Sequence, residues 1–381
     1  MDDPQRVPQP VSLKSRVQRV NRRTPGAKWN AKTIDALQKA LRKDPEANLA
    51  QLLGPKYTKN LESFKSIQPL AAQPAFDTTH NYDLRLRLDP NAATEIIRDL
   101  SPDLRGRLSN SATLSGAVTE LLSAGSVLFE DPCVTVLQIG TIAVKITGSD
   151  RTITEYGSLM YLQEHLPCFP APRPHGLIKL GDSYVLFTSL IPGVTLEKIW
   201  HQLSIPGKCA VRDQLEELLS QLRSLPFQEG ITQFGGVQGE GCKDLRRALY
   251  TSAEPIMNTK QFEEFILAGL KPKAVSPLYV RLLRRLMPDG VSCAFTHGDL
   301  RPANILVQVA EGGGTCQVQG IIDWESSGFY PAYWESFKAT NNLTPSEDCD
   351  WYEYLPDSAS PHKHGVSWLI DRLMDGRMNN S

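Results

Sequence analysis

The spacing of apolar residues predicts a helical start to the chain. Apolar positions recur at helical intervals over residues 31–42, 93–100 and 111–122. The second of these segments follows Pro90, and proline is typical of the first turn of a helix. Together the three segments predict a helical N-terminal extension over residues 31–124.

From residue 125 the pattern changes to short apolar, β-branched runs separated by turn residues. The predicted strands cover residues 127–129, 134–139, 142–146, 177–180 and 184–190, with one predicted helix over residues 154–165 between them. After the break at Ile191-Pro192-Gly193, helical spacing returns over residues 196–203, 212–225, 261–270 and 278–286. A small sheet with one helix, followed by a larger helical half, is an α+β arrangement.

The nearly neutral charge of the 381-residue chain conceals two oppositely charged parts. Lys and Arg total 41 and Asp and Glu total 42, but residues 1–50 carry 11 of the bases and only 5 of the acids. Residues 4–34 hold eight bases, no acid and four prolines, which predicts a basic flexible arm over residues 1–30. Its bases are dispersed, so a nucleic-acid partner is disfavoured. A regulatory or protein-interaction segment and a merely solvated tail both stay open.

Composition excludes several classes of protein. No stretch reaches about 18 uninterrupted apolar residues, the length that a membrane-spanning helix needs. The residues after Met1 lack the apolar core of a secretory signal, and the seven cysteines are scattered without a C-x-x-C pair. We therefore expect reduced thiols and a cytoplasmic protein with no membrane partner.

The most informative segment begins at His297-Gly298-Asp299 and continues through Asn304 into an apolar strand. A second apolar run ends at Asp323, and the glycines at 312–314 between the two runs predict a β-hairpin. This hairpin would bring Asn304 close to Asp323. An amide oxygen and a carboxylate together suit Mg²⁺. Asp299 precedes them on a loop, where it can accept the proton of an attacking hydroxyl.

These motifs resemble the protein-kinase-like phosphotransferases, in particular the aminoglycoside phosphotransferase and choline kinase branch, which has His-Gly-Asp where protein kinases have His-Arg-Asp. The resemblance covers roughly residues 125–355. The run from Asp323-Trp324-Glu325 to Glu335 resembles the fungal phosphotransferase subgroup in particular. The resemblance implies a two-lobed protein-kinase-like fold, with a nucleotide-binding N-lobe over residues 125–190 built on a small antiparallel sheet. The C-lobe, over residues 191–381, would be mainly helical and would bind the substrate.

The same resemblance implies roles for individual residues. Asp299 matches the catalytic base, and Asn304 and Asp323 match the magnesium ligands. His297 matches a structural residue that braces the loop, so no proton transfer is assigned to it.

Upstream, Lys145 lies among the apolar residues of a predicted strand, and Glu155 stands ten residues later near the start of the predicted helix. Lysine is rarely buried without a partner. The two residues resemble the pair that holds the α- and β-phosphates of ATP. An edge-strand surface lysine and a helix-terminal acid are the structural alternatives. Ser189 and Leu190 resemble the hinge whose backbone meets adenine, and a buried strand ending in a turn explains them as well.

One departure from protein kinases is the turn at residues 130–133, which has no glycine. Fewer backbone amides can then approach the phosphates of a nucleotide. Two other features favour structural explanations. We expect His362-Lys363-His364 to form an exposed loop rather than a metal site. We expect the acidic and aromatic run 347–354 to pack on the body rather than to bind a cation.

We expect a small-molecule kinase that transfers the γ-phosphate of ATP, with Mg²⁺, to a hydroxyl of a small metabolite or antibiotic-like acceptor. The acidic surplus outside residues 1–50 weakly favours a cationic acceptor. The missing glycines and the long extension leave an alternative, a weak pseudokinase or a regulatory binding module on the same fold. A protein kinase is disfavoured because the Asp323 region runs directly into Tyr333-Trp334 without an Ala-Pro-Glu segment.

Overall fold

The computed structural model describes residues 25–53, 57, 61, 82–108, 112–244, 250–268, 276–310, 315–344 and 347–378. The chain divides into two compact units, Met1–Asn81 and Tyr82–Ser381. In the first unit, α1 (Pro25–Lys43) contacts α2 (Leu49–Leu53). Helix α1 confirms the helix predicted over residues 31–42, and it already includes the last residues of the predicted basic arm. Residues 1–24 of that arm lie outside the described residues.

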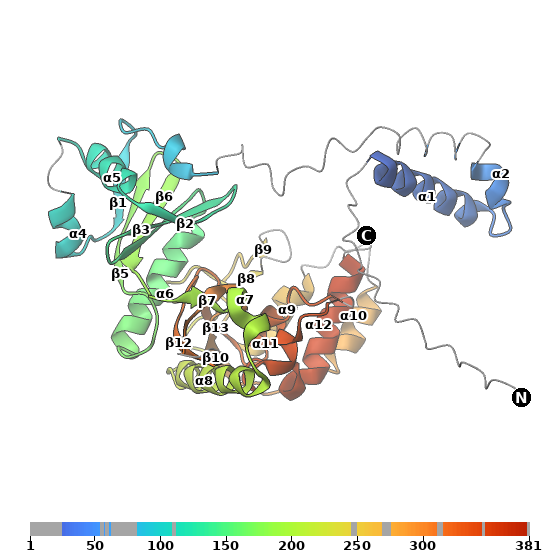
Figure 1. Ribbon diagram of the computed structural model, residues 1–381. Helices are drawn as coiled ribbons and strands as arrows, with labels where there is room; N and C mark the ends of the chain where they lie inside the picture. Colours follow the sequence, from blue (N-terminus) through green and yellow to red (C-terminus); the bar gives the residue numbers. More distant parts are fainter. Residues whose placement is uncertain are drawn as a thin grey trace, which may run out of the picture. The chain divides into compact units, whose positions relative to one another are not determined.

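The second unit contains a six-stranded antiparallel sheet with the strand order β1-β5-β6-β4-β3-β2 (Figure 1). Its strands are β1 (Thr94–Arg98), β2 (Ser126–Glu130), β3 (Val134–Ile139), β4 (Ile142–Thr147), β5 (Pro174–Leu180) and β6 (Ser183–Ser189). Helix α6 (Arg151–His165) contacts the sheet at β5 and β6. The five strands predicted after residue 125, and the helix between them, are confirmed.

Strand β1 corrects the helix predicted over residues 93–100. Residues Thr94–Arg98 pair with β5, and Thr94 lies opposite Leu180. Thr94, Ile96 and Ile97 are β-branched, which suits a pleated surface, and β5 supplies the hydrogen-bonding partner. The partner is more than 70 residues away along the chain, so periodicity in a short window could not indicate it.

The helical segments between residues 84 and 123 pack on one face of this sheet. They form the short 3-10 helix η1 (Leu84–Arg87), α4 (Pro102–Arg107) and α5 (Leu114–Ser123), of which α5 confirms the helix predicted over residues 111–122. Leu104 and Val118 are fully buried in one cluster with Val144 and Phe187 of the sheet. The predicted extension over residues 31–124 is thus divided between the two units, and only its part from residue 82 onward, called the extension below, shares a hydrophobic core with the sheet.

The arginine Arg85 holds this packing together through polar contacts. Its guanidinium donates hydrogen bonds to the carbonyl oxygens of Leu122 (3.0 Å) and Gly125 (2.7 Å), at the end of α5. Asp83 pairs with the same guanidinium at 2.6 Å, and the hydrogen bond to Arg85 lowers the pKa of Asp83. Carbonyls at a helix C-terminus have no partner within the helix, so Arg85 supplies one.

The second half of the unit is mainly helical, as predicted (Figure 1). Its helices are α7 (Leu196–Ile199), η2 (Trp200–Gln202), α8 (Ile205–Arg223), α9 (Thr259–Ala268), α10 (Pro277–Arg284), η4 (Pro302–Asn304), α11 (Trp334–Ala339), η5 (Asp350–Tyr354), η6 (Pro361–His364) and α12 (Gly365–Met378). Its strands are β7 (Val194–Thr195), β8 (Lys243–Asp244), β9 (Tyr250–Thr251), β10 (Cys293–Thr296), β11 (Ile305–Val309), β12 (Cys316–Ile321) and β13 (Gly328–Pro331). Within the described residues, none of these helices has both the length and the apolar composition for crossing a bilayer.

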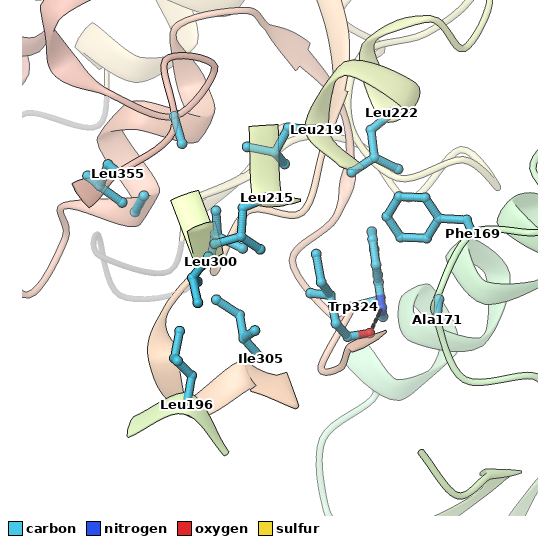
Figure 2. Packing of buried hydrophobic residues seen from close by; sticks show 14 of the residues in the cluster. Phe169, Ala171, Leu196, Leu215, Leu219, Leu222, Leu300, Ile305, Trp324 and Leu355 are labelled. Atoms are coloured by element: carbon cyan, nitrogen blue, oxygen red, sulfur yellow. Dashed lines mark hydrogen bonds between the residues drawn. The ribbon is translucent and has the colours of Figure 1, made fainter. Parts of the chain in front are cut away.

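Helix α8 shows how local sequence places the core of this half. The Ser204 hydroxyl caps its first turn by accepting a hydrogen bond from the Gly207 amide. Leu215, Leu219 and Leu222 then recur at helical intervals and are buried together. Figure 2 shows these leucines beside Trp324, which is fully buried and donates a 2.8 Å hydrogen bond to the carbonyl of Ile321. Trp324 thereby anchors the end of the predicted hairpin in the core.

The shared core of extension and sheet leads to a test of stability. Leu104 is fully buried and Leu86 is 70 % exposed, although both belong to the residues before β2. We expect Leu104→Ala to lower the free energy of unfolding by about 2–5 kcal/mol, because it leaves a cavity in that core. Leu86→Ala is the matched control, with an expected change within about 0.5 kcal/mol. Equal denaturation midpoints for the two variants would show that residues 82–124 do not share the folded core of the sheet.

Candidate functional site

The site is organised around the ammonium of Lys145 on β4. Side chains alternate along this strand, so Ile142, Val144 and Ile146 face the extension while Lys145 faces α6. The Lys145 Nζ atom lies 2.8 Å from a carboxylate oxygen of Glu155 on α6 and 2.7 Å from one of Asp323. The predicted pair of Lys145 and Glu155 is therefore formed in this structure.

A third acid, Glu325, also binds the ammonium, at 3.0 Å, and our sequence prediction did not assign it a role. Oxygens of Glu155, Asp323 and Glu325 all lie within 4.8 Å of one another. Arg151, at the start of α6, pairs with the other oxygen of Glu325 at 2.6 Å. Three acids thus share two bases, in a site where the Lys145 side chain is only 14 % exposed.

This crowding shifts the pKa values of the site. Burial disfavours the charged form of Lys145, but the three carboxylates outweigh burial and raise its pKa well above the usual value. Burial would raise the pKa of Asp323 too, yet the charge and hydrogen bond of Lys145 lower it. Burial, together with the nearby charges of Asp323 and Glu325, raises the pKa of Glu155 to about 7 in spite of Lys145. Glu155 therefore takes up a proton near neutral pH.

The hairpin that carries Asp323 forms as predicted. Strands β11 and β12 are antiparallel with Ile305 opposite Ile321, and the Ile322 amide donates a 2.9 Å hydrogen bond to the Asn304 carbonyl. The glycines at 312–314 lie outside the described residues. Within the described chain, Asp323 is the one residue other than glycine with a positive φ, 69°. Such a backbone costs about 1–3 kcal/mol and is typical of functional sites, and here it turns the carboxylate toward Lys145.

The loop with Asp299 is held by two hydrogen bonds of the His297 ring. The buried His297 accepts a bond from the Asp299 amide at Nδ1 (3.2 Å), and its Nε2 lies 3.0 Å from the carbonyl of Ile322. A carbonyl can only accept, so these two partners place the ring proton on Nε2. His297 therefore links the loop to the hairpin, in agreement with the bracing role expected for it.

Asp299 and Asn304 are brought together directly. The Asn304 amide nitrogen donates 2.9 Å bonds to both the backbone oxygen and the Oδ2 atom of Asp299. Arg301 approaches the same Oδ2 atom at 3.2 Å. Because the Asn304 nitrogen is committed to Asp299, its amide oxygen is the atom left for a cation.

Glu335 is a second acid that sequence reasoning missed. It is 2 % exposed, lies at the start of α11 and accepts hydrogen bonds from the backbone amides of His297 (2.7 Å) and Gly298 (3.3 Å). Burial raises its pKa, while His297 and the two amides act in the opposite direction. The only signal in the sequence was its place in the run after Asp323, which carries no information about the amides it meets.

Helix α6 also contacts the segment of the C-lobe that leads into β8. Lys243 on β8 donates a 3.0 Å hydrogen bond to Thr154, the residue before Glu155. Gln238, on the glycine-rich segment before β8, accepts a 2.6 Å hydrogen bond from Arg98. The Gln238 side chain also packs against Gly157 of α6, where an added Cβ would lie only 2.8 Å from it. These contacts hold α6 in the position in which Glu155 reaches Lys145.

Of the two predicted hinge residues, Ser189 is the last residue of β6 and Leu190 follows it. The Ser189 amide donates to the Arg173 carbonyl and the Leu190 amide to the Thr141 carbonyl, both at 2.8 Å. Both amides are therefore committed within the N-lobe. An adenine contact at Ser189 or Leu190 would have to use a carbonyl oxygen.

The weaker candidates have structural roles. Trp351 is buried with its ring edge-to-face against Trp200, at 5.1 Å between centroids. Asp350 accepts a 2.8 Å bond from the Trp200 indole and pairs with Lys208, so the run 347–354 packs on the body as expected. Residues Pro361–His364 form the short helix η6 instead of the predicted loop. His362 is exposed, and no cluster of metal ligands in the described residues includes it.

Comparison with known proteins identifies the family. Residues 147–369, more than half of the chain, match the model of the phosphotransferase enzyme family. The chain belongs to this family. It has the two-lobed protein-kinase-like fold expected from its motifs, with a small antiparallel sheet beside a helical half. The fungal subgroup stays a prediction, and no curated protein sequence matches the chain.

Several solved phosphotransferases resemble this family member at low sequence identity. A thermostable mutant of aminoglycoside phosphotransferase APH(4)-Ia, in a ternary complex with AMP-PNP and hygromycin B, is 16 % identical with a TM-score of 0.43, over 67 % of this chain and 84 % of that one. The streptomycin–ATP complex of APH(2")-IIa is 12 % identical with a TM-score of 0.43, over 70 % and 91 %. The aminoglycoside-3'-phosphotransferase of type VIII is 17 % identical with a TM-score of 0.40, over 67 % and 94 %.

The glycine of the His297-Gly298-Asp299 loop leads to a prediction. Gly298 has a φ of +77°, and an added Cβ would lie 2.2 Å from the carbonyl oxygen of Ser326. We expect Gly298→Ala to destabilise the fold by about 2 kcal/mol or more, because the loop must shift away from that backbone. Gly148→Ala is the matched control, since nothing lies within 4 Å of its added Cβ. Urea denaturation measures both, and equal stabilities would contradict this account of the loop.

The raised pKa of Glu155 predicts a pH dependence of stability. Its folded pKa of about 7 lies above the ordinary 4.5, so its contribution is complete below about pH 4.5 and is lost as the pH rises through 7. We expect the free energy of unfolding of the ligand-free protein to fall by on the order of 2 kcal/mol more between pH 5 and 8 than that of Glu155→Gln. Urea titrations at a series of pH values measure this difference. Parallel pH profiles for the two proteins would contradict the prediction.

Proposed function

We propose that this protein is a small-molecule kinase that transfers the γ-phosphate of ATP to a hydroxyl group. The observation that carries the proposal is the ammonium of Lys145, which joins Glu155 on α6 to Asp323 at the end of the hairpin. An ammonium held in this way can bind the α- and β-phosphates of a nucleotide. Membership of the phosphotransferase enzyme family supports the reaction class.

Asn304 and Asp323 would hold Mg²⁺. Both offer oxygen atoms, which a small hard cation prefers. The amide nitrogen of Asn304 is committed to Asp299, which leaves its oxygen, and the pKa of Asp323 is lowered, so its carboxylate is charged at neutral pH. When bound, the ion would offset negative charge on the phosphates.

Asp299 would act as the base. Its Oδ2 atom is oriented by Asn304 at 2.9 Å and by Arg301 at 3.2 Å, which leaves Oδ1 for the acceptor. The acceptor oxygen forms a bond to the γ-phosphorus, the bond from that phosphorus to the β-bridging oxygen breaks, and the hydroxyl proton passes to Asp299. Positioning and charge stabilisation supply most of the catalysis in such a transfer.

The acceptor is proposed to be a small hydroxylated metabolite or antibiotic-like molecule. The chain carries more acids than bases outside residues 1–50, which favours a cationic amine. The cytoplasm, where ATP and Mg²⁺ are abundant, is the proposed location. A panel of hydroxylated amines and sugars, tested for ATP consumption by the purified protein, would identify the acceptor.

The role of Asp299 is tested by Asp299→Asn. We expect this change to lower phosphoryl transfer by about 10²–10⁴-fold, because the hydroxyl proton loses its acceptor. Stability and Mg-ATP affinity should stay close to those of the wild type, since Asn keeps the shape and one acceptor oxygen. Asp182→Asn, in an exposed turn, is the control and should keep full activity. Unchanged turnover in Asp299→Asn would exclude this mechanism.

A pseudokinase or regulatory binding module is the second candidate, and the glycine-free turn between β2 and β3 favours it. Wild-type protein that shows a thermal shift with Mg-ATP but phosphorylates no acceptor of the panel would support a binding module. Product formation that depends on Asp299 would support the kinase.

A further inference from the structure

The turn between β2 and β3 lies beside the candidate nucleotide site. Val134, the first residue of β3, lies opposite Thr147, and Val136 lies opposite Lys145. The turn therefore begins only two residues beyond the row of Lys145, roughly 7 Å along the strand direction. In nucleotide-binding loops the backbone amides of such a turn bind phosphate oxygens.

In this protein the amides of the turn already have partners. The amides of Cys133 and Val134 each donate a 2.7 Å hydrogen bond to the Oδ1 atom of Asp131. The Asp131 amide donates to the Val134 carbonyl at 2.8 Å, and Pro132 has no amide proton. Every backbone donor from Asp131 to Val134 is thus accounted for.

The group that occupies these amides is an anion. A carboxylate oxygen that accepts two amide bonds has the hydrogen-bonding chemistry of a bound phosphate oxygen. Asp131 makes no ion pair with a described residue, so its negative charge stays at the turn. The neighbouring Glu130 ends β2 opposite Thr135 and lies on the face of the sheet that carries Arg85, away from Lys145. A nucleotide phosphate approaching this turn would meet the like charge of Asp131 and no available amide.

We propose that Asp131 occupies the phosphate-binding position of the β2–β3 turn and thereby lowers the affinity of this protein for nucleotide phosphates. This inference rests on the proposed function, because it takes the cleft beside Lys145 to be the nucleotide site. The phosphates are then held by Lys145 and the metal ligands alone. The effect of Asp131 on nucleotide affinity therefore depends on how many phosphates the nucleotide carries.

The test compares two substitutions at one position. Asp131→Gly removes both the charge and the acceptor, so the turn amides become available and the backbone can approach the phosphates. Asp131→Asn removes the charge but keeps the Oδ1 acceptor, so the amides stay occupied. Asp182→Asn is the matched control, since Asp182 is an exposed aspartate in the β5–β6 turn, at the end of the sheet that also carries Thr147.

Calorimetric titration with Mg-ATP, Mg-ADP and adenosine measures the effect. We expect Asp131→Gly to bind Mg-ATP about tenfold more tightly than the wild type, the amount that one hydrogen bond to a charged group contributes. The gain should shrink for Mg-ADP and vanish for adenosine, which has no phosphate. The affinity of Asp131→Asn for Mg-ATP should rise about twofold from the lost repulsion alone. The affinity of Asp182→Asn should equal that of the wild type.

Two results would overturn the inference. The first is a folded Asp131→Gly variant, judged by its urea midpoint, that binds Mg-ATP no more tightly than the wild type. The second is a gain in affinity that is equally large for adenosine, which would place the effect away from the phosphates. If wild type and both Asp131 variants bind no nucleotide at all, the proposed function fails together with the inference. If the wild type binds and phosphorylates but Asp131→Gly brings no gain, only the inference fails.

Discussion

The need to neutralise the ammonium of Lys145 determines how β4, α6 and the segment after β12 are arranged. Lys145 is placed on the α6 face of its sheet by strand alternation, and its three acids come from α6 and from the segment after β12. A buried charge that loses its partners costs several kcal/mol, so these elements must converge on the ammonium. Arg151 and Lys243 then hold α6 from two sides, which keeps Glu155 within reach. The ion pairs of Lys145 with Asp323 and Glu325 thus join the two lobes at the site where the chemistry is proposed to occur.

Close backbone contacts hold the segments around this polar centre in place. Gly298 lies against the backbone of Ser326, and Gly328 lies against that of Gly235, with no room for a side chain at either glycine. Trp324 is fully buried between the leucines of α8 and the ring of His297. The strained backbone of Asp323 is tolerated because both neighbouring residues are held in place. The amide of Ile322 is hydrogen-bonded to the Asn304 carbonyl, and Trp324 is packed in the core. Rigid packing thus holds the proposed catalytic groups in place before any ligand binds.

Local sequence patterns predicted most of the elements, because apolar periodicity and turn residues report directly on which face of an element is buried. The hairpin of β11 and β12 could be predicted from two apolar runs and the glycines between them, and with it the approach of Asn304 to Asp323. The pattern failed at Ile96 and Ile97, where pairing with β5 decided between strand and helix. Short apolar segments are ambiguous until their hydrogen-bonding partner is known.

The motif residues Lys145, Asp299 and Asp323 could be named from sequence because their residue types and spacing are unusual outside a phosphotransferase. The sequence by itself therefore determined the reaction class and the two-lobed plan. Only the tertiary structure showed that Glu325 shares the ammonium and that Glu335 holds the loop that carries Asp299. The reason is that a carboxylate acquires its role from the donors it meets, and those donors come from segments far apart in the chain. Lys145 and Glu325 are separated by 180 positions, and folding alone brings them within 3.0 Å.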